Sequence, residues 1–192
     1  MTLLITGLII WYVAHLIKRV TPEFRQSLSE KMGNASKGVF ALLIVLSVVL
    51  MVLGYRRADF IPVWFPPEFM VHLNNLLMLT ALYVYGAGGP KGAKVWLGTK
   101  IRHPQLVGFS IWAVAHLLVN GDLASLMLFG ALLVWAQLSI FMINAADGPW
   151  VRPDRAPAKK EIVLVGITLV LFCIIAGVHI WLGRWPFPGG PA

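Results

Sequence analysis

Six long apolar runs, separated by short polar loops, most strongly constrain what this chain can fold into. They cover approximately residues 2–17, 38–54, 69–86, 104–119, 123–146 and 162–182. A helix rises about 1.5 Å per residue, so roughly 17–25 apolar residues cross the hydrocarbon core of a bilayer. We therefore predict an all-α fold, a polytopic membrane helix bundle with about six transmembrane helices. It forms a single domain over residues 1–192, with the lipid bilayer as its main partner.

The low content of charged residues argues against a soluble domain. Only 12% of the residues are charged, whereas a soluble domain carries about 25%. The net charge of +8 lies in the loops, so it indicates orientation in a membrane and no nucleic-acid partner. The single cysteine, Cys173, excludes an internal disulfide and any C-x-x-C site.

Lysine and arginine predict the orientation of the bundle. The loops after the first, third and fifth runs hold thirteen of these residues, and the other side holds three: Arg56, Arg57 and Arg184. Cytoplasmic loops of membrane proteins carry the excess of positive charge. The three basic loops are therefore expected in the cytoplasm, and both termini on the opposite side.

Turn and capping residues divide the chain between runs. The sequence "VNGD" at 119–122 signals a tight turn, which predicts a helical hairpin from the fourth and fifth runs. Pro104 suits the first turn of a helix, and Asp122 is expected to cap the next one. Segment 19–37 is polar and partly helical by pattern, and we expect it on the cytoplasmic surface.

Histidines are the most informative polar residues inside the apolar runs. Four of the five, His15, His72, His116 and His179, lie within predicted spans, and His103 lies at a membrane surface. Ionisable groups within a membrane are costly and usually face the bundle interior. Each could be a neutral imidazole bonded to a neighbouring helix, but four together favour a ligand shared by at least two.

The ligand that needs least from this sequence is a planar apolar cofactor. Imidazole binds Zn, Cu, Fe and Ni, but no carboxylate is embedded in a span, which disfavours a hydrolytic metal site. Haem needs only axial histidines and an apolar slot between helices. Trp112 precedes His116 by one turn, and small residues flank it at Gly108, Ala113 and Ala115, as a slot or ordinary helix packing would require.

Other polar residues are candidates for supporting roles. Arg102 or His103 could pair with a cofactor propionate, because arginine binds carboxylates in a bidentate manner. Asn74 and Asn75 follow His72 closely and could hydrogen-bond across helices or support a ligand histidine.

Two segments carry a family resemblance: "RHPQLVGFSIWAVAHLLVNGDLASLMLFG" and the early "WYVAHLIKR". They resemble the NnrU family of bacterial inner-membrane proteins, which includes the plant 15-cis-zeta-carotene isomerases. The resemblance implies a multi-pass protein of the bacterial inner membrane, in which the outward-facing termini predicted from the basic loops would be periplasmic. It further implies haem b bound through His15 and His116, in a protein linked to nitrite and nitric oxide metabolism in denitrifiers.

The chain departs from the isomerase branch at two places. That branch has cysteine three residues before the second ligand histidine, where this chain has Ala113, and "HSG" at the first, where His15 is followed by Leu16. The primary interpretation is a haem protein acting in nitrogen-oxide metabolism or its regulation, with a nitrogen oxide or small apolar substrate. The alternatives are a cofactor-free membrane assembly partner and a haem-dependent polyene isomerase.

Helix depth and resemblance favour different partners for His116. His15 lies about 21 Å from the outer end of its span, and His116 only about 6 Å from its own. Depth alone pairs His116 with His72 or His179, which lie near the same end. The resemblance pairs it with His15, and that pair is the one we predict, with His72 and His179 as alternates.

Overall fold

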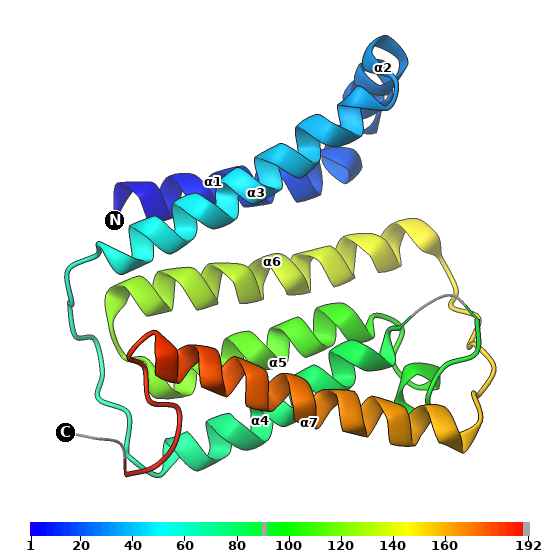
Figure 1. Cartoon of the computed structure of the whole chain (residues 1–192). Coiled ribbons are helices and arrows are strands. Elements are labelled where there is room, and N and C mark those ends of the chain that lie inside the picture. Colours follow the sequence, from blue (N-terminus) through cyan, green and yellow to red (C-terminus); the bar gives the residue numbers. More distant parts are fainter. Residues whose placement is uncertain (90–91, 190–192) are drawn as a thin grey trace.

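The computed structural model describes residues 1–89 and 92–189, and this part of the chain is almost entirely helical. Consecutive long helices run in alternating directions, so the segments that connect them lie at the two ends of the molecule (Figure 1). The helices are α1 (Thr2–Val20), α2 (Pro22–Met32), α3 (Ala35–Arg56), α4 (Met70–Ala87), α5 (Pro104–Val119), α6 (Leu123–Asp147) and α7 (Ala158–Trp181), with a 3₁₀ turn η1 at Leu97–Thr99.

The predicted all-α membrane bundle is confirmed, since each of the six apolar runs forms one helix. Four of them, α1, α3, α6 and α7, are long and apolar enough to cross a membrane. Helix α5 is apolar but shorter, at 16 residues, and α4 lies outside this set of four. The expected helical content of segment 19–37 is confirmed as α2, which begins at Pro22.

Helices α1 and α3 form a close-packed pair joined by α2. Gly54 of α3 allows this approach, because a Cβ there would lie 2.2 Å from the Leu4 backbone nitrogen. Gly7 of α1 has the same role, with the Ser47 carbonyl oxygen 2.8 Å from an added Cβ. Small residues at such contacts let helix backbones approach in a membrane, where packing drives association.

Helices α4 and α5 form a second close pair. A Cβ at Gly108 would lie 2.6 Å from the Tyr85 backbone nitrogen. Pro104 occupies the first turn of α5, as predicted. The Asp122 side chain caps α6, as predicted, by accepting from the Ser125 backbone nitrogen at 3.0 Å. Helices α5 and α6 pack against each other, which confirms the predicted hairpin.

The α1–α3 pair contacts the rest of the bundle mainly near the chain's N-terminus. A buried cluster there joins α1, α3 and α6 through Leu4, Leu8, Met51, Ala124 and Leu132. The Tyr12 hydroxyl donates to the Ala131 carbonyl at 2.6 Å across α1 and α6. Towards α2 the α1–α3 pair leans away from α6 (Figure 1).

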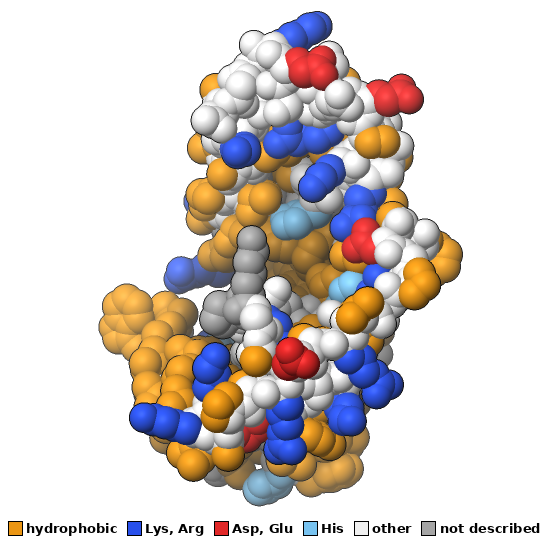
Figure 2. All heavy atoms as spheres, turned by 90° about the vertical axis from the view of Figure 1, so that its right-hand side faces the viewer, with side chains coloured by type: hydrophobic (Ala, Val, Ile, Leu, Met, Phe, Trp, Pro, Cys, Tyr) orange, Lys and Arg blue, Asp and Glu red, His pale blue; other side chains and the backbone are white. Residues whose placement is uncertain are grey.

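The three basic loops lie at the same end of the bundle: α2 is at the tip of the α1–α3 pair, and the α4–α5 and α6–α7 loops lie below α6 (Figure 1). The two loops are joined by Lys94, whose backbone nitrogen donates to the Asp154 carbonyl at 2.9 Å. Figure 2 shows lysine and arginine side chains spread over this end. They surround a hollow that is lined by hydrophobic side chains and lies below the α1–α3 pair. Lys91, also expected in these loops, lies outside the described residues.

Candidate functional site

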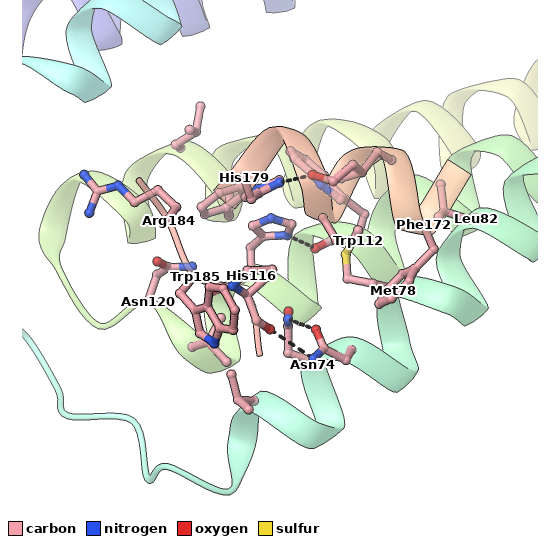
Figure 3. A pocket seen from close by; sticks show the side chains of 18 of the residues that line it. Asn74, Met78, Leu82, Trp112, His116, Asn120, Phe172, His179, Arg184 and Trp185 are labelled. Carbon is pink, nitrogen blue, oxygen red and sulfur yellow. Dashed lines mark hydrogen bonds between the residues drawn. The ribbon is translucent and has the colours of Figure 1, made fainter. Parts of the chain in front are cut away.

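A cavity of about 700 Å³ lies near the end of the bundle opposite α2. Helices α5 and α7 both pack on α4 much more than on each other, and the space between them is the cavity (Figure 3). Helix α6 contributes Phe129 to the wall, and α3 contributes Tyr55. The segment after α7, from Gly183 to Pro186, lines it as well.

His116 enters this cavity from α5. Its Nδ1 lies 2.9 Å from the Trp112 carbonyl oxygen, one turn earlier. A carbonyl only accepts, so Nδ1 carries the proton in the neutral ring and Nε2 keeps a lone pair. The ring stacks on Phe129, with centroids 4.6 Å apart. Its orientation is therefore set by a backbone bond on one side and an aromatic face on the other.

His179 enters the same cavity from α7. Its Nδ1 lies 2.8 Å from the Ile175 carbonyl oxygen, so its Nε2 is also the lone-pair nitrogen. Figure 3 shows the two imidazoles beside each other at the cavity. Two residues that are 63 positions apart in the sequence are thus brought together, each with a nitrogen able to bind a metal.

His15 lies in a different environment, on α1 and outside the residues that line the cavity. Its Nδ1 contacts the Trp11 carbonyl at 2.9 Å, and its ring lies 4.0 Å from Trp11 and 4.9 Å from Trp135 between centroids. A row of aromatic contacts then continues through Phe109 and Trp112 to His116. His15 and His116, the pair implied by the family resemblance, are thus connected by a row of aromatic side chains, but only His116 lines the cavity.

His72, Arg102 and His103 do not line the cavity. His72 is exposed on α4. Arg102 precedes α5 at its other end, where its guanidinium donates to the Gly148 carbonyl at 2.7 Å. His103 contacts the Asn144 side-chain oxygen through Nε2 at 2.9 Å.

Three asparagines line the cavity: Asn74 and Asn75 near the start of α4, and Asn120 at the end of α5. Asn75 donates to the Pro186 carbonyl at 3.0 Å, which ties the segment after α7 to α4. Sequence reasoning singled out Asn74 and Asn75 but missed Arg184 and Trp185, which line the cavity too. The signal for them was Gly183, whose φ of +76° permits the turn that brings this segment back onto α4.

No group of three or more His, Cys, Asp or Glu side chains suited to a metal ion occurs in residues 1–89 and 92–189. A bare ion would need further ligands from the protein. Haem needs only the two axial positions from the protein, because the macrocycle supplies the other four ligands. The donor set of the cavity, two neutral imidazoles among aromatic and aliphatic side chains, fits that group.

The fold and the cavity define a class, namely helical membrane proteins with an interior histidine site between helices. The chain belongs to the NnrU family, whose model, described as NnrU protein, matches residues 3–186. The match covers nearly the whole chain and confirms the resemblance. No curated protein and no solved structure matches the chain.

Proposed function

We propose that this NnrU-family protein binds haem b in the membrane through His116 and His179. The observation that supports this most is the pair of imidazoles at one 700 Å³ cavity, each with Nδ1 bonded to a backbone carbonyl. Such a bond fixes the tautomer and orients Nε2, as it does for most metal-bound histidines. Small-molecule and cofactor sites commonly measure about 300–1,000 Å³.

The residues around the two histidines would have distinct roles toward the cofactor. Trp112 and Phe129 would contact its apolar faces, since aromatic walls favour a planar macrocycle. Arg184, at the rim, is the cation of the cavity suited to a propionate. Arg102, which the sequence suggested for that role, lies at the other end of α5, and its guanidinium is engaged by Gly148.

His116 and His179 would hold the haem, which would supply one-electron chemistry when bound. Following the family's link, we propose that the protein acts in nitrite and nitric oxide metabolism or its regulation, in the bacterial inner membrane with periplasmic termini. The positive-inside distribution of the three basic loops supports that orientation.

A haem-dependent polyene isomerase is the second candidate, supported by the apolar cavity alone. The isomerase branch has cysteine at the position of Ala113, and here that residue is fully buried in α5 with 0% exposure. Ala113 carries no thiol and does not line the cavity, so this position offers no thiolate ligand. The third candidate is a cofactor-free assembly partner, for which the histidines would be packing residues.

Optical spectra of the detergent-purified protein, oxidised and then reduced with dithionite, test the haem proposal. We expect a Soret band with sharp reduced α and β bands in the unchanged protein, and loss of the low-spin spectrum in His116→Ala and His179→Ala. His72→Ala, an exposed histidine on α4, is the matched control and should behave as the unchanged protein does. A colourless protein after expression with ample haem would overturn the proposal in favour of the assembly partner.

A further inference from the structure

A glutamine lies near the middle of α6, at the depth of the hydrocarbon core. Gln137 is about 21 Å from the start of α6 at Leu123 and about 15 Å from its end at Asp147, and its side chain is exposed. A glutamine side chain is too short to reach either membrane surface from there. Its amide therefore faces lipid tails, which offer no hydrogen-bond partner.

Hydrogen bonds to α5 fix the orientation of this amide. The Ser110 hydroxyl donates its only proton to the Leu106 carbonyl at 2.8 Å, so it accepts from the Gln137 nitrogen Nε2 at 2.7 Å. The Gln137 oxygen Oε1 is consequently directed away from Ser110. In residues 1–89 and 92–189, no group bonds to Oε1 or to the second proton of Nε2. The backbone N–H groups around Oε1 are already used within α6.

The exposed side of α6 around Gln137 has the spacing of a helix-pairing face. Its residues, which we call the α6 seam, are four, three and four positions apart: Gly130, Val134, Gln137 and Phe141. This alternation lets two helices pack along one face. Val134 is 59% exposed and Phe141 is 70% exposed, and nothing lies within 4 Å of a Cβ added at Gly130. A glycine with open space beside it lets a second helix approach closely.

A second copy of the chain supplies the partner that the amide lacks. Two copies inserted in the same orientation are related by a two-fold axis along the membrane normal, so their α6 helices run parallel and Gln137 meets Gln137. We infer that the α6 seam is the interface of a parallel homodimer, in which each Oε1 accepts the second Nε2 proton of the other copy. Both amides are then satisfied at once, and each keeps its bond to Ser110.

The dimer does not depend on haem binding. Helix α6 lines the cavity through Leu128 and Phe129, which lie on another side of the helix from the seam. Association and the optical spectrum can therefore fail separately.

Cysteine crosslinking in membranes locates the interface. Val134→Cys in a Cys173→Ala background, which removes the one native cysteine, should form a disulfide-linked dimer under mild oxidation. The unchanged protein is the matched control, because Cys173 is an exposed cysteine on α7 and should give no such dimer.

Energy transfer between labelled copies in liposomes measures the strength of association. Gln137→Leu should weaken the dimer about eight-fold, as the loss of two interhelical hydrogen bonds of average strength implies. Thr80→Leu is the control for removing an exposed polar side chain, since the Thr80 hydroxyl already bonds the Leu76 carbonyl of its own helix at 2.9 Å. Its dimer should be as tight as that of the unchanged protein.

A second variant leaves the bond between Gln137 and Ser110 intact. Gly130→Leu should weaken the dimer at least as much, because the added side chain keeps the two helices apart. Gly166→Leu on α7 is its control, since a Cβ there also meets nothing within 4 Å, and it should leave association unchanged.

A chain that stays monomeric at the highest ratio of protein to lipid would overturn the inference, as would a dimer that crosslinks through Cys173 and not through position 134. Equally tight dimers in Gln137→Leu, Gly130→Leu and the unchanged protein would overturn the role of the α6 seam. Crosslinking of Val134→Cys to a protein of different mass, with no dimer, would assign the seam to another partner. A haem spectrum in a monomer would refute the dimer alone, and a colourless dimer would refute haem binding alone.

Discussion

His15 and His116 make the same local bond in opposite surroundings. Each ring donates Nδ1–H to the carbonyl four residues earlier, at 2.9 Å in both cases. His15 is then enclosed by two indoles, whereas His116 lines a cavity with His179. The helix alone thus sets the tautomer, and tertiary packing decides which side chains surround the ring.

Removing each histidine in turn gives the largest expected difference between the two environments. Loss of a residue that only supports a metal ligand commonly costs 10–100-fold in affinity, so losing a ligand itself should cost more. We expect His179→Ala to weaken haem binding by more than about 100-fold, and His15→Ala to change it by less than about three-fold, because His15 lies outside the cavity. Haem titration followed at the Soret band measures both.

Added imidazole sharpens this comparison. His179→Ala would leave a gap at the cavity wall, so millimolar imidazole should restore the low-spin spectrum. If His15→Ala instead loses the spectrum and His179→Ala keeps it, the pairing implied by the family resemblance is correct. The Trp135 and Phe109 side chains between α1 and α5 would then have to rearrange around the cofactor.

Packing around His15 predicts the next largest effect, on stability. Trp135 is 8% exposed and contacts Trp11, His15 and Phe109. Trp135→Ala should lower the free energy of unfolding by about 3 kcal/mol, as for other large-to-small changes at buried aromatic residues. Trp181→Ala, 83% exposed on α7, is the control and should cost less than about 0.5 kcal/mol. Denaturant unfolding in detergent measures both, and equal losses would show that the His15 cluster is not tightly packed.

The helices could be predicted from sequence because apolar length is a local property. The runs 104–119 and 123–146 correspond closely to α5 and α6, with the proline and the aspartate cap at the expected positions. The cavity could not be predicted in this way, since it depends on α5 and α7 both packing on α4. Depth along the helices offered His72 or His179 as the partner of His116, and the structure has His179 at the cavity and His72 exposed. Depth alone could not separate them, because it does not say which face of a helix a side chain occupies.

The residues that sequence reasoning missed belong to irregular backbone. Arg184 and Trp185 follow a helix end, where the Arg184 backbone nitrogen donates to the His179 carbonyl at 2.8 Å and Asn75 donates to the Pro186 carbonyl at 3.0 Å. Nothing in a hydrophobic pattern predicts such a tertiary bond. Arg102 was suggested because arginine binds carboxylates, but about 14 residues, or roughly 21 Å along a helix, separate it from His116.

Gly54→Ala addresses the packing of α3 against α1, the helix that carries His15. The added methyl group would lie 2.2 Å from the Leu4 nitrogen, so the helices must separate, at a cost of about 1–3 kcal/mol. Gly38→Ala is the control in the same helix, because nothing lies within 4 Å of a Cβ there. Thermal unfolding should distinguish the two variants, and equal melting temperatures would mean that the pair tolerates a wider spacing.

Tyr12→Phe tests the smallest difference, the polar contact that holds α1 against α6 near His15. The hydroxyl donates to the Ala131 carbonyl at 2.6 Å, and hydrogen bonds between membrane helices are worth about 0.6 kcal/mol on average. A loss of that size in the free energy of unfolding, with an unchanged Soret band, would show that α1 is fastened independently of the cavity. Tyr85→Phe, on the half-exposed tyrosine of α4, controls for loss of a hydroxyl. A shift of the Soret band in Tyr12→Phe alone would mean that α1 and its histidine are coupled to the cofactor after all, since a change at the α1–α6 contact would then have reached the iron.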